Sequence, residues 1–438
     1  MTIKSIFSKC LVLAALMLGN AACTLTDFPD PNNPSVQGVL TDATRSDLQG
    51  LVSGIEAAMR IRYDNYVDAC SVIGREYWRL STSDPRYTGD MLGKNNSELD
   101  NSLFFLTGPY AGRYRAIKNA NVLIESIPAS KAGLSDAQKR GYTGMAKTLQ
   151  AYQLLLVLNQ LYDTGIRVDV ANPDALGAFV TRPAALDAIA ALLDAANTEL
   201  TGAEFVFKLS EGFAGFDDAV AFAKFNRALA ARVDLYREKY GDALTKLNGS
   251  FLDLNGDYAK GPKHYFSNVG GDVINSLYLP LEATGEVRIA HPTYIADAIP
   301  SDSRFINNVK RRAAPITFDG LTGNYDVNVY KTNADDAPII RNEELVLIYA
   351  EAKAKTGATA DAVAAINKVR TAAGIGAYTG ATTEAALIDE ILYQRRYSLF
   401  GEGHRWLDLR RLGKLGILPL DRAGDKVHVQ FPKPQGEN

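Results

Sequence analysis

Apolar residues recur every three or four positions over most of the chain after residue 44, which is the spacing of one face of an α-helix. The segment 44–62 is typical, because a start rich in Thr, Ser and Asp precedes apolar residues that share one face. By the same reasoning, helices are predicted over residues 44–62, 110–127, 135–161, 184–200, 217–240, 242–252, 342–355, 360–373 and 384–400. The chain is therefore expected to fold as an all-α protein.

Short turns containing glycine join several of these segments, for example at residues 240–242 and 355–357. Paired helices with short turns and small residues at their contacts are typical of a tetratricopeptide-like stack, in which each pair buries its apolar face against the next. We therefore predict one helical-repeat domain over residues 44–438.

Two long regions, 76–109 and 255–338, lack helical periodicity and are rich in glycine, proline and aromatic residues. Loops of this length in a compact domain are usually functional or disordered, and their aromatic content argues against disorder. Aromatic faces stack on sugar rings or on peptide side chains. The sequence predicts an aromatic ligand platform formed by Trp78, Tyr87, Tyr265 and Tyr278, although such rings can also simply anchor loops to helices.

The N-terminus has the features of a secretory signal peptide. Lys4 and Lys9 precede a short apolar run, and the small pair 21–22 precedes Cys23. The run is too short to cross a bilayer as a helix. We predict a signal peptide over residues 1–22, lipidation at Cys23 and a flexible tether over 23–43. An ordinary signal peptide followed by an incidental cysteine is the alternative.

Composition and charge narrow the class of protein. The chain is 47% hydrophobic and 22% charged with a formal net charge of -3, as in ordinary globular proteins, and no basic cluster suggests nucleic acid as a partner. Of its three cysteines, Cys10 lies in the predicted signal peptide and Cys23 at its end. That leaves Cys70 without a disulfide partner, and we expect it to be a buried residue of a helix.

Near the C-terminus, Gly401 and Gly403 interrupt the helical pattern. Between and beside them, Glu402 and His404 could form an acid/base pair, although no nucleophile or metal ligand lies nearby in the sequence. The structural interpretation is favoured, in which these residues serve the fold only.

The residues that follow support this interpretation. Arg405, Asp408 and Arg411 recur every third position, which places them within reach of one another on a short helix. Trp406 is expected to be buried beside an Arg–Asp pair.

The same segment resembles a known family. Residues 402–411 read E-G-x-R-W-x-D-L-x-R, and residues 347–352 read L-x-Y-A-E-A. Both patterns are similar to segments of the SusD/RagB family of outer-membrane nutrient-binding lipoproteins, although Gln394 and Ser398 stand where that family usually carries Glu. The resemblance implies a SusD-like helical scaffold, a surface-exposed lipid anchor, an oligosaccharide or oligopeptide ligand and a TonB-dependent outer-membrane transporter as partner.

Enzyme and metal motifs are weak in this sequence. The four histidines are scattered, and neither a zinc-protease pattern nor a nucleophile elbow occurs. Three hypotheses remain: a lipid-anchored nutrient-binding protein, a secreted glycan-degrading hydrolase, and a helical-repeat scaffold that binds only protein. The resemblance favours the first, without enzymatic activity and without a metal or other cofactor.

Overall fold

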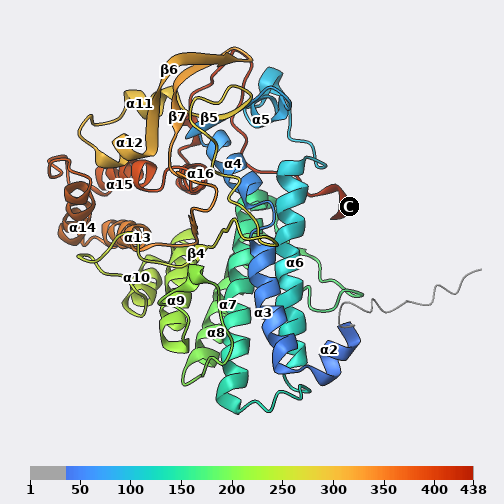
Figure 1. Cartoon of the computed structure of the whole chain (residues 1–438). Coiled ribbons are helices and arrows are strands. Elements are labelled where there is room, and N and C mark those ends of the chain that lie inside the picture. Colours follow the sequence, from blue (N-terminus) through green and yellow to red (C-terminus); the bar gives the residue numbers. More distant parts are fainter. Residues whose placement is uncertain (1–35, 438) are drawn as a thin grey trace, which may run out of the picture.

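The computed structural model describes residues 36–437. The predicted signal peptide and Cys23 lie outside this range. Long helices build the lower part of the molecule and pack on one another in chain order from α6 to α9 (Figure 1). They are α3 (Arg45–Met59), α6 (Phe104–Ser126), α7 (Asp136–Leu161), α8 (Arg182–Leu200) and α9 (Ala219–Tyr236). The shorter α2 (Val36–Asp42) and α10 (Tyr240–Asn248) lie beside them, and α4 (Tyr63–Ile73) lies above α3 in this view.

Four further helices form the C-terminal part and enclose a second hydrophobic core, which includes Val346, Ile366 and Ile391. They are α13 (Asn342–Lys355), α14 (Thr359–Ala372), α15 (Glu384–Ser398) and α16 (Arg405–Arg411). The remaining α-helices are α5 (Arg86–Gly89), α11 (Pro292–Ala296) and α12 (Ser303–Asn308). Among the described helices, none is both long and apolar enough to span a bilayer.

Local sequence signals explain where the long helices begin. Thr44 caps α3 and exchanges hydrogen bonds with Asp47, while Ser135 does the same with Gln138 at the start of α7. The predicted starts of the helices 44–62 and 135–161 are thereby confirmed, while α3 ends earlier than predicted, at Met59.

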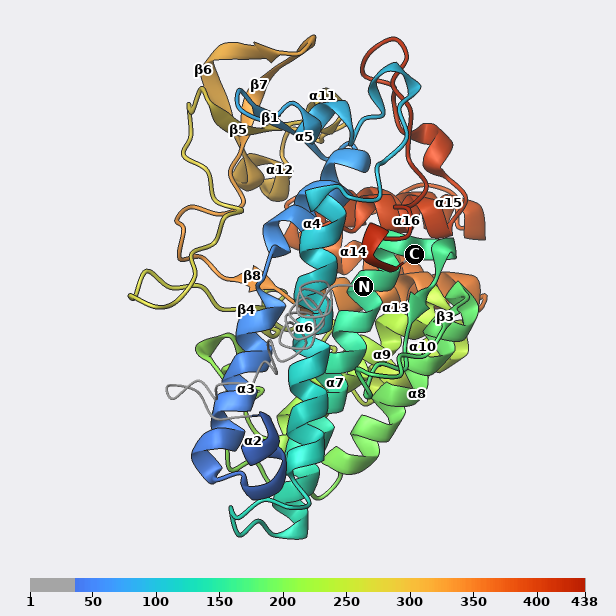
Figure 2. The ribbon, with the colours of Figure 1, turned by 90° about the vertical axis from the view of Figure 1, so that its right-hand side faces the viewer.

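The chain is rich in helices, as expected, but the two long regions predicted as loops also contribute an antiparallel sheet. Its strand order is β1 (Tyr77–Ser81), β5 (Glu286–Ala290), β7 (Leu321–Val327) and β6 (Val309–Phe318). The sheet lies at the end of the molecule opposite α2, as both views show (Figures 1 and 2). Two short strand pairs complete the sheet structure, β2 (Ile166–Arg167) with β3 (Phe179–Val180), and β4 (Lys263–His264) with β8 (Ala337–Pro338).

The sheet lacks the alternating pattern by which strands are normally recognised. All five residues of β1 are buried, including the polar Arg79 and Ser81, so buried and exposed positions do not alternate along it. In the edge strand β6, the register shifts between Arg311 and Ile316, and Pro315 lies within this irregular stretch. For these reasons the two-residue periodicity of a half-buried strand does not identify β1 or β6 in the sequence.

Two boundaries also differ from the prediction. Residues 36–43, assigned to the tether, belong to the folded body, because α2 covers most of them and Ala43 is fully buried. The loop region 76–109 includes the first turns of α6, which begins at Phe104 and carries Pro109 inside the helix. The folded part therefore starts no later than residue 36.

The C-terminal segment has the structure that its residues predict. Trp406 is fully buried, and its indole N–H donates to the carbonyl of His428 at 2.8 Å. The carboxylate of Asp408 accepts from Arg395 at 2.6 Å and from Arg411 at 2.9 Å. Gly403 has a φ of +81°, and a Cβ there would lie 3.2 Å from the Cβ of Cys70, itself buried in α4.

Candidate ligand-binding site

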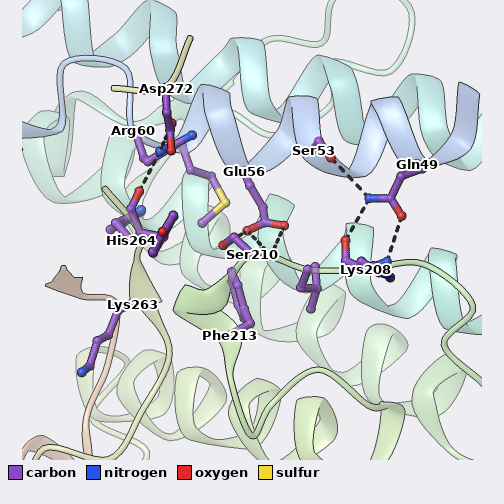
Figure 3. Close-up of a pocket in the computed structure, with 13 residues that line it drawn as sticks. Gln49, Ser53, Glu56, Arg60, Lys208, Ser210, Phe213, Lys263, His264 and Asp272 are labelled. Atoms are coloured by element: carbon purple, nitrogen blue, oxygen red, sulfur yellow. Dashed lines mark hydrogen bonds and ion pairs between the residues drawn. The ribbon is translucent and has the colours of Figure 1, made fainter. Parts of the chain in front are cut away.

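A cavity of about 300 Å³ lies between α3 and two segments that approach it from later in the chain (Figure 3). Its walls are α3, the segment 208–213, which ends in the 3₁₀ helix η3 (Glu211–Phe213), and the segment 263–272. We call this cavity the α3 groove. It is lined by Gln49, Ser53, Glu56, Met59, Arg60, Lys208, Leu209, Ser210, Phe213, Lys263, His264, Tyr265 and Asp272.

The polar side of the groove comes from one stripe of α3 and its C-cap. Gln49, Ser53, Glu56 and Arg60 follow one another at steps of three or four residues, so they lie on one helix face. The apolar stripe of the same helix, which includes Val52, faces the core. Sequence reasoning missed this site because a polar helix stripe normally faces solvent.

Side chains of this stripe hold the segment 208–213 in place. The amide of Gln49 donates to the carbonyl of Lys208 at 2.9 Å and accepts from its N–H at 2.8 Å. The carboxylate of Glu56 accepts from the N–H of Ser210 at 3.1 Å and also from its hydroxyl. The wall formed by the segment 208–213 is therefore fixed to α3 by paired hydrogen bonds (Figure 3).

Arg60 fixes the opposite wall. Its guanidinium donates to the carbonyl of Tyr265 at 2.7 Å and forms an ion pair with Asp272 at 2.6 Å. A second cavity of about 240 Å³ shares Arg60 as a wall and is bounded by Asp64, Phe266 and the segment 273–276. The loop after β4 thus passes α3 with a cavity on each side of the Arg60 bridge.

Burial determines the charge state of the titratable groups. Removal from water raises the pKa of Glu56, although the hydrogen bonds from Ser210 oppose the shift. Burial also lowers the pKa of His264 well below its usual value, so this imidazole is neutral at pH 7. The His264 ring lies 4.3 Å from the ring of Tyr63, measured between centroids.

The loop that borders both cavities exposes apolar surface beside polar groups. Tyr265 is half-buried, while Val269, Val273 and Ile274 are exposed. An aromatic or aliphatic face next to hydrogen-bonding groups suits a ligand that carries both C–H surface and hydroxyl or amide groups. The arrangement can therefore bind a sugar or a peptide.

Trp78 does not lie in a loop, contrary to the expectation. It belongs to β1, is 4% exposed and pairs with Ile289 of β5. Its indole N–H donates to Asp421 at 3.2 Å, and its ring packs edge-on against His291. A side chain enclosed in this way has no free face on which a ligand could stack.

The other aromatic residues of the predicted platform have different surroundings. Tyr87 lies on α5, packs edge-on against Phe105 and carries the guanidinium of Arg79 4.7 Å from its ring centroid. Tyr265 alone among the four lines the α3 groove, and Tyr278 is half-buried further along the same loop. The structure therefore separates Trp78 and Tyr87 from Tyr265.

The acid/base alternative at the C-terminal segment finds no geometric support. Glu402 forms an ion pair with Arg341 at 2.9 Å, and the Nε2 of His404 lies 3.8 Å from Glu344. Burial lowers the pKa of His404 to about 4. Within residues 36–437, no group of three or more His, Cys, Asp or Glu side chains is placed to hold a metal ion.

Several solved structures share this fold. A SusD superfamily protein from Bacteroides vulgatus is 15% identical with a TM-score of 0.68, covering 90% of this chain and 96% of its own. Surface glycan-binding protein A from Bacteroides thetaiotaomicron, solved with laminarihexaose, is 16% identical with a TM-score of 0.70, covering 90% and 97%. A laminarin-binding SusD-like protein is 18% identical with a TM-score of 0.64, also covering 90% and 97%. No curated protein matches the chain.

These similarities show that the chain has the fold of SusD-like proteins. Two of the proteins named above are described as glycan-binding or laminarin-binding. The sequence profile of the SusD family matches residues 319–434, the part that contains the C-terminal segment described above. Residues 319–434 thus match the SusD family, and the fold of the described chain is that of SusD-like proteins.

Proposed function

We propose that this protein binds an oligosaccharide in the α3 groove and the adjoining cavity, and delivers it to a TonB-dependent outer-membrane transporter. The observation that carries the proposal is the pairing of the half-buried Tyr265 with the ordered polar stripe of α3 across one groove. The SusD-like proteins named above, which bind laminarin or laminarihexaose, support a glycan over a peptide.

The charged groups of the groove favour binding over hydrolysis. Glycoside hydrolases place two free carboxyl groups on either side of the bond that they cleave. Here the carboxylate of Asp272 is paired with Arg60, and that of Glu56 is engaged by Ser210. Carboxylates that already hold the walls through these contacts are poorly placed to act as a catalytic acid or base. We propose that the ligand is released intact.

Titration calorimetry with laminarin oligosaccharides, other glycan oligomers and oligopeptides tests the ligand class. Tyr265→Ala should weaken binding of the active glycan by about 1–3 kcal/mol, since truncation removes a stacking face. Tyr378→Ala is the matched control, because Tyr378 is also half-buried but lies near α14, away from the groove. Binding of peptides alone, or equal affinity in both variants, would contradict the proposal.

Product analysis separates binding from turnover. The bound glycan should be recovered at its original length after prolonged incubation with the purified protein. Shortened products that disappear in Glu56→Gln would instead identify a hydrolase.

We propose further that Cys23 is lipidated and anchors the protein at the cell surface. The support is the predicted signal peptide with its small residues before Cys23, together with the match of residues 319–434 to the SusD family. Co-purification with a TonB-dependent transporter from outer membranes tests the partnership.

A further inference from the structure

A small pocket at the C-terminal end of α7 contains two arginines that have no acidic partner. It is lined by side chains of four helices and of Tyr162, which follows α7. Three of its lining residues are arginines, Arg182, Arg410 and Arg411, and no lining residue is acidic. This pocket is separate from the α3 groove and shares no lining residue with it.

Arg411 is neutralised by its neighbours. Its guanidinium donates to Glu351 at 2.7 Å and to Asp408 at 2.9 Å. Asp408 also pairs with Arg395, and Glu344 pairs with Arg232. In this buried network the arginines 232, 395 and 411 balance the carboxylates 344, 351 and 408, so no negative charge remains for the pocket.

Arg182 and Arg410 are not neutralised. Arg410 donates to the carbonyls of Val429 and Asn159, each at 2.7 Å, and Arg182 donates to the carbonyl of Tyr236 at 3.3 Å. Within the described part of the chain, neither arginine forms an ion pair. Neutral carbonyls orient these guanidinium groups but leave their charges uncompensated.

Both guanidinium groups also lie against the same aromatic ring. The guanidinium carbon of Arg410 lies 3.9 Å from the ring centroid of Tyr162, and that of Arg182 lies 4.4 Å from the same centroid. Burial lowers the pKa of Arg410 to about 10, and the charge of Arg182 adds to this effect. Like charges near one another disfavour their charged forms, and an anion in the pocket would offset this effect.

Two buried polar atoms on the lining have no partner in the described structure. They are the Nε of Arg410 and the hydroxyl of Tyr236, which belong to residues that are 7% and 6% exposed. Both are hydrogen-bond donors, and buried donors are nearly always satisfied in native proteins. An anion in the pocket would compensate the two arginines and offer an acceptor to the Nε of Arg410.

We propose that this pocket binds a halide ion, held by Arg182 and Arg410 and ordering the junction of α7, α8, α9 and α16. Its volume of about 20 Å³ suits a particle about the size of one water molecule. A single halide ion is closer to this size than tetrahedral sulfate or phosphate.

Thermal unfolding at constant ionic strength tests the site, with sodium gluconate replaced stepwise by sodium chloride. Chloride should raise the Tm of the purified protein by about 2 °C in a saturable way, because it binds only the folded state. Arg182→Gln should abolish this rise. Arg115→Gln should retain it, because Arg115 is an exposed arginine of α6 and the substitution removes the same charge.

A second measurement does not depend on the folding of a variant. Crystals of the unmodified protein grown in sodium bromide should give an anomalous peak between the guanidinium groups of Arg182 and Arg410. Absence of that peak, or a chloride response that is equal in Arg182→Gln and Arg115→Gln, would overturn the proposal.

Discussion

At the residue scale, the two tryptophans differ in their sequence context but are both buried. Trp406 lies in a helix whose pattern predicts burial, and Trp78 lies in a strand whose sequence resembles a loop. Burial of Trp78 follows from contacts with His291 and Asp421, which are more than 200 residues away in the chain. No local pattern could have predicted these contacts.

Trp78→Ala should therefore destabilise the fold. We expect a loss of about 3–5 kcal/mol, the usual cost of truncating a buried aromatic ring. Urea unfolding measures this loss, and Tyr378→Ala, which removes a half-buried ring, serves as the control with a smaller effect. A Trp78→Ala protein that unfolds at the same urea concentration as the unmodified protein would contradict the burial described above.

Glu76 gives a prediction about pH. Burial raises its pKa to about 7, and one carboxylate oxygen has no partner in the described structure. Because the folded pKa exceeds the ordinary value of 4.5, the folded protein binds the proton more tightly than the unfolded chain does. This contribution to stability is complete below about pH 4.5 and is lost as the pH rises through about 7.

Glu76→Gln removes that dependence. Relative to the unmodified protein, the variant should gain stability between pH 5 and pH 8, approximately the interval over which the buried carboxyl ionises. Urea unfolding of both proteins across this range supplies the difference. Parallel stability curves would show that the Glu76 carboxyl does not titrate there.

At the element scale, the α3 groove depends on a close approach between η3 and β4. A Cβ at Gly212 would lie 2.2 Å from the carbonyl oxygen of Lys263, which is closer than any real contact. Only glycine allows these two segments to meet at the groove. The sequence alone does not show that this residue must be glycine, because the contact with Lys263 is visible only in the folded chain.

Gly212→Ala should separate η3 from β4, lowering stability and weakening glycan binding by at least tenfold. Gly241→Ala is a suitable control, because a Cβ there meets no atom within 4 Å and the residue lies in α10. Calorimetry with the glycan and thermal unfolding provide the two readouts. Unchanged glycan affinity in Gly212→Ala would show that the ligand does not bind in the α3 groove.

At the scale of the whole molecule, the folded body described from residue 36 is connected to Cys23 by only a short segment of chain. We predict that Cys23→Ala releases the protein from the membrane fraction without changing its melting temperature. Cell fractionation and thermal unfolding of the released protein test both parts. Retention of the variant in membranes of cells that lack the transporter would contradict lipidation.

The sequence alone determined the long helices, because each carries its own apolar stripe and several carry their own caps. The helix predicted over 342–355 matches α13 at both ends, and Ser135 marks the start of α7. Burial of Trp406 and Cys70 followed from the same local patterns. Motifs at fixed spacing also identified the SusD family.

Only the tertiary structure revealed the sheet, the α3 groove and the pocket that contains Arg182 and Arg410. The strands β1 and β5 pair across more than 200 residues, and Arg60 meets Asp272 over a similar separation. Partners so distant leave no periodic trace in either segment, so a buried strand resembles a loop and a binding stripe resembles a solvated helix face. Local propensity fixes the elements, whereas long-range contacts fix which of their surfaces remain open to a ligand.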